Sequence, residues 1–160
     1  MTNKSKPFWL TGVAIVAPFL CFFYPVDRIE ITLMESDQHC LIEPHFSLEW
    51  IHSVEHQPWR EFYRLQDGRL FLYQTDFKTF GAGTPNEGKV LKKEGGYISF
   101  KTEQSLPELR WITSRNARST LYNHEEIPWL IYLEQEDYSE VLIQPRRVPY
   151  LVSLIKDQCY

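Results

Sequence analysis

The sequence is short of glycine and cysteine and contains no internal repeat. Only 7 glycines and 3 cysteines occur among its 160 residues, whereas aromatic residues make up 15%. This composition excludes a disordered or low-complexity chain. The length is sufficient for one domain with a sizeable hydrophobic core.

Charged residues are absent from positions 7–26, which read PFWLTGVAIVAPFLCFFYPV. Twenty helical residues, each rising about 1.5 Å, would span about 30 Å, the thickness of the hydrocarbon core of a bilayer. Lys4 and Lys6 precede this stretch, and Asp27 and Arg28 follow it. The positive-inside rule then leaves the N-terminus in the cytoplasm and exports the rest of the chain.

This charge-free stretch predicts a membrane anchor at residues 1–27 and an exported domain at residues 28–160. A cleaved signal peptide is the alternative, but its cleavage site requires small residues just beyond the apolar core. The far end of the stretch instead has the bulky residues LCFFYP. We therefore expect a single-pass protein of the inner membrane, with its C-terminal domain in the periplasm or outside the cell.

The sequence also has no excess of basic over acidic residues. Residues 27–160 contain 15 lysines and arginines and 21 acidic residues, so the exported part has a net charge near −6. This balance argues against nucleic acid or an anionic lipid surface as the main partner.

No C-x-x-C pair or zinc-ribbon spacing occurs, and the sequence indicates no metal and no cofactor. Cys40 and Cys159 both fall in the exported part. A disulfide between them would tie the C-terminal tail to the start of the domain, and two free thiols are the alternative.

Short runs of alternating apolar and polar residues dominate after position 27, and no sustained helical period is present. Strands are predicted at residues 28–35, 46–53, 59–65, 69–77, 97–103, 109–114, 128–135 and 138–145. Turns are predicted at Asp67-Gly68, Gly95-Gly96 and Glu136-Asp137, and residues 149–159 could form a short helix. Crossover helices for a parallel sheet are missing. The expected fold is therefore mainly β, a compact antiparallel sandwich or barrel preceded by one transmembrane helix.

The stretch HSVEH at residues 52–56 spells the H-x-x-E-H signature of a class of zinc peptidases. That signature requires a helix, which brings both histidines to one face beside the glutamate. Here Trp50, Ile51 and Val54 favour a strand, in which the two histidines would lie about 13 Å apart. They could not share one metal ion, so we assign no metal ligand.

A serine hydrolase is not indicated either. In a strand, His52 and Ser53 would point to opposite faces, so His52 could not activate Ser53. The G-x-S-x-G elbow of many such enzymes is absent. The sequence therefore predicts no catalytic residue.

Two motifs resemble those of a small bacterial family of uncharacterised function, a domain of unknown function. The first is HSVE followed by P-x-x-E, and the second is a GAGxP loop. In this chain they comprise His52, Ser53, Val54, Glu55, Pro58 and Glu61, then Gly81, Ala82, Gly83 and Pro85. Members commonly carry an N-terminal apolar segment, and their genes commonly accompany TRAP transporters of the TAXI type.

The resemblance implies an accessory part of a TAXI-type TRAP uptake system, with the permease and the substrate-binding protein as partners. It implies no established activity. An envelope hydrolase or metal-binding enzyme using His52 and Glu61, and an envelope scaffold unconnected with transport, remain the alternatives.

The candidate interaction residues can also be explained without a function. The loop around Gly81, Gly83 and Pro85 could present backbone N–H groups to an anion, or could simply be a tight bend. Glu55 and Glu61 could form a recognition patch, or could pair with nearby arginines, namely Arg60, Arg64, Arg115 or Arg118. Arg115 could bind a carboxylate bidentately, or could belong to a solvated loop.

Overall fold

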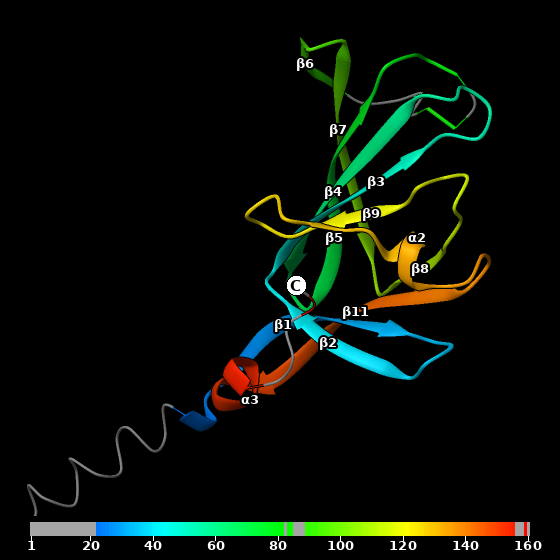
Figure 1. Cartoon of the computed structure of the whole chain (residues 1–160). Helices are drawn as coiled ribbons and strands as arrows, with labels where there is room; N and C mark the ends of the chain where they lie inside the picture. Colours follow the sequence, from blue (N-terminus) through cyan, green and yellow to red (C-terminus); the bar gives the residue numbers. More distant parts are fainter. Residues whose placement is uncertain (1–21, 82, 85–88, 156–158, 160) are drawn as a thin grey trace, which may run out of the picture.

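The computed structural model describes residues 22–81, 83–84, 89–155 and 159, which form two antiparallel β-sheets (Figure 1). The smaller sheet has the strand order β2-β1-β11-β8, formed by β1 (Pro25–Leu33), β2 (Gln38–Ile42), β8 (Leu109–Ile112) and β11 (Glu140–Pro149). The larger has the order β10-β9-β3-β4-β5-β7-β6, formed by β3 (His45–Ile51), β4 (Pro58–Gln66), β5 (Arg69–Phe77), β6 (Lys89–Glu94), β7 (Tyr97–Leu106), β9 (Thr120–Tyr122) and β10 (Pro128–Trp129). The mainly β, antiparallel fold expected from the sequence is confirmed.

One hydrophobic core joins the two sheets in a sandwich-like arrangement. The smaller sheet supplies Ile29, Ile31, Leu33, Ile42, Val141 and Ile143, and the larger supplies Phe46, Leu48, Tyr63, Leu70, Leu72 and Leu121. The alternation of apolar residues along the strands places these side chains on the inner faces, because successive side chains of a strand point to opposite sides.

Two of the three predicted turns are tight hairpin turns. Asp67 and Gly68 join β4 to β5 with φ of 51° and 70°, and Gly95 and Gly96 join β6 to β7 with φ of 57° and 80°. Positive φ at both central residues matches the right-handed twist of antiparallel strands. Both predictions are confirmed.

The strand predicted at residues 128–135 is wrong. Only Pro128 and Trp129 are in a strand, β10, and the helical turn α2 (Ile131–Glu134) follows. Gln135 donates a backbone hydrogen bond to the carbonyl of Ile131 at 3.0 Å, and the Ile131 side chain is fully buried in the core. A short apolar run fits a buried strand and a buried helical turn equally well, so its pattern cannot distinguish them.

The hairpin predicted at Glu136-Asp137 is also wrong, although the chain does turn there. The backbone N–H of Ser139 donates to the carbonyl of Glu136 at 3.2 Å. The turn leads from α2 to β11, which belongs to the smaller sheet, whereas β10 belongs to the larger one. It therefore carries the chain between sheets instead of joining neighbouring strands.

The C-terminal part contains the predicted short helix, α3 (Tyr150–Ile155), which follows directly on β11. Cys40 of β2 and Cys159 form a disulfide, with their Cα atoms 5.3 Å apart. Both cysteines pack against the core. The disulfide therefore fixes the tail beyond α3 to the edge of the smaller sheet.

The predicted membrane anchor lies mostly outside the described residues. Strand β1 begins at Pro25, within the last residues of the charge-free stretch. Within the part of the chain that the structure describes, no helix has the length and apolar character needed to cross a membrane.

Candidate functional site

The HSVEH stretch forms the turn between β3 and β4, so the prediction of a strand through residue 53 is wrong at its end. Strand β3 ends at Ile51, and His52 donates its backbone N–H to the carbonyl of Gln57 at 2.9 Å. The backbone N–H of His56 in turn donates to the carbonyl of His52 at 2.9 Å, with φ of 51° at His56. This closed turn is not the helix that the zinc-peptidase signature requires.

The imidazole of His52 stabilises the turn from inside. Its Nδ1 accepts the backbone N–H groups of Val54 at 3.4 Å and Glu55 at 3.3 Å. These two bonds require an unprotonated Nδ1, because a protonated nitrogen cannot accept. The His52 ring also stacks on Trp59, with 5.2 Å between ring centroids. The histidine therefore has a structural role that the alternation pattern did not indicate.

A shallow pocket lies beside this turn, with a volume of about 530 Å³. It is lined by residues of the turn and of the loop that follows β8, namely Ile51, His52, Ser53, His56, Ser114, Asn116 and Ala117. Among the described residues, no hydrogen bond joins Ser53 to a histidine. No group of three or more His, Cys, Asp or Glu side chains in the described ranges is placed to hold a metal ion.

The two motifs that are separated in the sequence meet in space. The Glu55 carboxylate lies so close to the Cα of Gly81 that any Cβ at position 81 would clash with it. The loop turns directly after this contact, since Thr84 donates its backbone N–H at 3.3 Å and its hydroxyl at 2.8 Å to the Gly81 carbonyl. Gly83 has a φ of 81°, which L side chains rarely adopt. Ala82 and Pro85 lie outside the described residues.

An aromatic cluster lies beneath this junction. Trp59 packs on Trp50 and Phe77 with centroid distances of 6.0 and 5.3 Å. Phe77 packs in turn on Phe80 at 5.2 Å and on Phe100 at 6.2 Å. Phe80 directly precedes Gly81 and is 59% exposed. The cluster therefore runs from the buried face of the larger sheet to the surface at the second motif.

Glu61 occupies an unusual position on the apolar face of the larger sheet. Its backbone pairs with Leu48 on one side and with Thr75 on the other. The Tyr63 hydroxyl donates a hydrogen bond to the Glu61 carboxylate at 2.5 Å. Burial raises the pKa of Glu61 above 4.5, and the bond from Tyr63 opposes that rise. Burial and the adjacent Glu61 also raise the pKa of Tyr63.

A hollow of about 760 Å³ opens beside Glu61. Its lining comes from β4, β5, β6, β7 and the second motif, and comprises Trp59, Glu61, Leu72, Thr75, Gly83, Lys89, Lys101, Thr102, Glu103 and Gln104. The strand register shifts at Leu72/Gln74 in the pairing of β5 with β7 and at Phe62/Tyr63 in the pairing of β4 with β5. Such bulges change the direction of side chains and often lie beside functional sites.

The polar groups of this hollow suit recognition of a hydrogen-bonding group. Trp59 is only 6% exposed, and its indole N–H has no hydrogen-bond partner among the described residues. Lys89 and Lys101 face each other across the β6–β7 pair, and Lys101 forms an ion pair with Glu103. The lining is mostly polar, since seven of its ten residues carry a polar or charged side chain around the buried Trp59 and Leu72.

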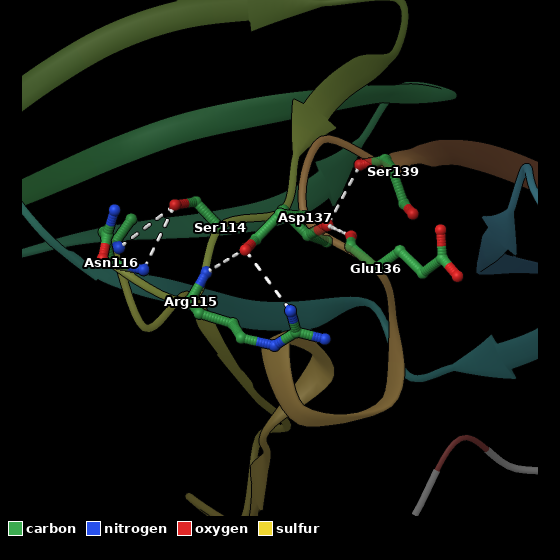
Figure 2. Close-up of polar contacts among 8 residues, drawn as sticks. Ser114, Arg115, Asn116, Glu136, Asp137 and Ser139 are labelled. Atoms are coloured by element: carbon green, nitrogen blue, oxygen red, sulfur yellow. Dashed lines mark hydrogen bonds and ion pairs between the residues drawn. The ribbon is translucent and has the colours of Figure 1, made fainter.

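Among the described residues, no ion pair joins Glu55 or Glu61 to the arginines that the sequence offered as partners. The Arg60 guanidinium bonds to the Ser47 hydroxyl and pairs with Glu126. Arg115 donates its backbone N–H to Asp137 at 2.6 Å, and its Nη1 lies 3.4 Å from the second carboxylate oxygen (Figure 2). Asp137 belongs to the turn before β11, and Arg115 belongs to the loop after β8. Their contact therefore joins this turn to this loop.

Replacement of Glu61 by glutamine is expected to change the pH dependence of stability. The pKa of Glu61 is higher in the folded state than in the unfolded chain, so the protonated carboxyl stabilises the fold. This stabilisation is fully present below pH 4.5 and is lost as the pH rises through the pKa of the folded state. Glutamine stays neutral and still accepts the Tyr63 hydroxyl. At pH 8, Glu61→Gln should unfold with a free energy higher than the wild type by on the order of 1 kcal/mol.

Urea denaturation between pH 4 and pH 8 measures this effect. The control is Glu35→Gln, which changes an exposed carboxylate between β1 and β2. A difference between Glu61→Gln and wild type that does not grow with pH would contradict the argument.

The sequence indicated Glu61 as an interaction candidate and Trp59 as a core or interface residue, but it did not indicate Tyr63 or Thr75. The signal was present in WREFYRL, because alternation in that strand already places Trp59, Glu61 and Tyr63 on one face. Thr75 could not be found in this way, since only the pairing of β5 with β4 brings it opposite Glu61.

The fold and site define an antiparallel two-sheet β-domain whose larger sheet carries both motifs and the hollow. The chain belongs to the family described as a domain of unknown function, DUF1850, which matches residues 46–128. This range spans nearly all of the larger sheet and omits β1, β2 and β11 of the smaller one. No curated protein and no solved structure matches the chain.

Proposed function

We propose that this protein is a membrane-anchored accessory subunit of a TAXI-type TRAP uptake transporter. Its exported β-domain acts by contact with the permease or the substrate-binding protein on the periplasmic or outer face. The proposal rests on the resemblance of the two motifs and on membership in a family whose activity is unknown. The charge-free stretch at residues 7–26 supports the anchor.

The contact of Glu55 with Gly81 is the observation that carries this proposal. It joins both motifs into one continuous surface, which we call the motif face and define as Ser53, Val54, Glu55, His56, Phe80 and Gly81. Val54 is 63% exposed and Phe80 is 59% exposed. Exposed apolar side chains beside polar ones are typical of protein-binding sites.

The rigid support of the motif face also favours a binding role. The turn is closed by His52, and Phe80 packs against the buried Phe77. A surface held in place before binding loses less conformational entropy when it binds. The geometry offers no comparable support for catalysis, because His52 Nδ1 serves the turn and the Glu61 carboxylate is bonded to Tyr63.

Purification from native membranes in mild detergent through a C-terminal tag tests the proposal. Mass spectrometry should find the permease or the binding protein in near-equal amounts with the tagged chain. Recovery of the chain with neither protein would refute the transport function.

Replacement of Val54 by glutamate should weaken this capture. The change places a charge on the motif face, which must be desolvated at an interface. We expect about a ten-fold loss of co-purified partner, equivalent to about 1.4 kcal/mol of binding free energy. Quantitative mass spectrometry of the purified complex measures this loss.

Leu133→Glu is the matched control, because Leu133 is 64% exposed on α2 and is not part of the motif face. It should leave the amount of captured partner unchanged. Equal losses with both variants would show that the motif face is not the contact surface.

A further inference from the structure

A second exposed apolar surface lies where the N-terminal and C-terminal segments meet. We call it the terminal patch, and its members are between 36% and 72% exposed, namely Phe22, Tyr24, Tyr150, Leu151, Leu154 and Ile155. The backbone N–H of Tyr150 donates to the Tyr24 carbonyl at 2.9 Å. Pro25 and Pro149 form the last paired position of β1 and β11, so both segments leave the smaller sheet at the same end (Figure 1).

An ordinary surface helix turns its apolar side chains toward the core and its polar side chains toward water. In helix α3 this arrangement is reversed. Ser153 is buried, whereas Leu151, Leu154 and Ile155 lie on one helical face at i, i+3 and i+4 and are exposed. A water-exposed face of this kind is unfavourable, at about 25 cal/mol for each Å² of apolar surface left in contact with water. The sequence of α3 therefore indicates an apolar environment outside the domain.

This helix is held in place at both ends. Strand β11 leads directly into it, and the Cys40–Cys159 disulfide fixes the tail that follows it. A fixed apolar face cannot fold away into the core, so it requires a partner.

The chain itself indicates which partner this is. The charge-free stretch of residues 7–26 enters the described structure at Phe22, which is itself a member of the terminal patch. A span at that stretch would bring the bilayer surface to this end of the domain. We propose that the terminal patch is inserted into the membrane interface and forms a second lipid contact beside the anchor. This inference rests on the anchor in the proposed function.

The surrounding polar groups fit the depth of such an insertion. Arg147 and Arg146 lie on β11 three and four residues before α3 begins, which corresponds to about 10–14 Å along a strand. Their side chains are 58% and 70% exposed and lie 3.9 Å from Glu30 and Asp27. Interfacial helices bury their apolar face about 5–10 Å into the boundary of head groups and acyl chains. The arginines would then reach the phosphates, and Tyr24 and Tyr150 would lie at head-group depth, where tyrosine is enriched.

This attachment determines the direction in which the domain points. Figure 1 shows α3 and the β6–β7 hairpin at opposite ends of the molecule. Residues of that hairpin line the hollow beside Glu61 together with Gly83 of the second motif. With α3 in the interface, the hollow is directed away from the bilayer, toward a soluble partner.

Photocrosslinking of the full chain tests the inference. Benzoylphenylalanine is incorporated at Leu154, the purified protein is reconstituted in nanodiscs of phosphatidylethanolamine and phosphatidylglycerol, and lipid adducts are quantified by mass spectrometry. The matched control carries the same label at Leu133, which is exposed on α2. We expect the label at Leu154 to give on the order of ten-fold more lipid adduct than the label at Leu133.

Three outcomes would overturn the inference. Equal adduct yields at both positions, from protein that stays in the nanodisc, would show that α3 faces water although the anchor holds. Release of the chain from the nanodisc would remove the anchor as well, and with it the basis of the proposed function. A protein adduct that replaces the lipid adduct when native membranes are irradiated would assign the terminal patch to another subunit.

Discussion

Replacement of both Cys40 and Cys159 by serine is expected to lower the free energy of unfolding by about 4 kcal/mol. The disulfide joins residues 119 positions apart. In the chain-entropy model a closed loop of about 100 residues gives about 4.7 kcal/mol, and removal of a native disulfide typically costs about 2–5 kcal/mol. Most small domains have a total stability of only about 5–15 kcal/mol. The double variant should therefore lose between about a quarter and four fifths of the stability and unfold at a clearly lower urea concentration. Urea denaturation followed by circular dichroism under non-reducing conditions measures the effect.

The third cysteine supplies the control for this experiment. Cys21 lies outside the described residues and takes no part in the disulfide, so Cys21→Ser should unfold at the same urea concentration as the wild type. Reduction of the wild type should reproduce the loss seen in the double variant. Identical unfolding midpoints for wild type and double variant would show that the pairing contributes no stability.

Replacement of Phe77 by alanine is expected to destabilise the domain by about 3–5 kcal/mol. Phe77 is 1% exposed and contacts Trp59, Phe80 and Phe100, so its removal leaves a cavity under the motif face. The change should also weaken partner capture, since Phe80 and the turn at His52 both rest on this cluster. Tryptophan fluorescence during urea denaturation measures the stability, and purification through the tag measures the capture.

The neighbouring Phe80 provides a comparison that separates these two effects. Because Phe80 is 59% exposed, Phe80→Ala should cost much less stability than Phe77→Ala and yet reduce capture by a similar factor. Normal capture by a folded Phe80→Ala variant would exclude this ring from the contact surface. A small stability loss in Phe77→Ala would mean that the cluster repacks around the cavity.

The pattern of the sequence determined most of the strands. Alternation at residues 28–35, 59–65 and 69–77 predicted three strands that the structure contains as β1, β4 and β5, because the two faces of a strand differ in environment. The pairs Asp67-Gly68 and Gly95-Gly96 predicted their hairpin turns, since few other residues accept positive φ at both positions. These features are local, so neighbouring residues are sufficient to specify them.

The turn at residues 52–56 and the segment at residues 128–135 show where local patterns fail. The HSVEH stretch continues the alternation of β3, but the chain reverses there because the His52 side chain accepts two backbone N–H groups. The segment after Trp129 forms α2, because a helical turn there places the Ile131 side chain in the core between the sheets. Tertiary contacts outweigh local preference in both places.

The sequence by itself determined an antiparallel β-domain, its main hairpins, a charge-free N-terminal stretch and two motifs. Only the tertiary structure decided that Glu55 of the first motif lies against Gly81 of the second, that Glu61 lies opposite Thr75, and that Cys40 pairs with Cys159. The physical reason is that these relations join residues distant in the chain. Their geometry depends on strand register and sheet packing, and a local pattern contains neither.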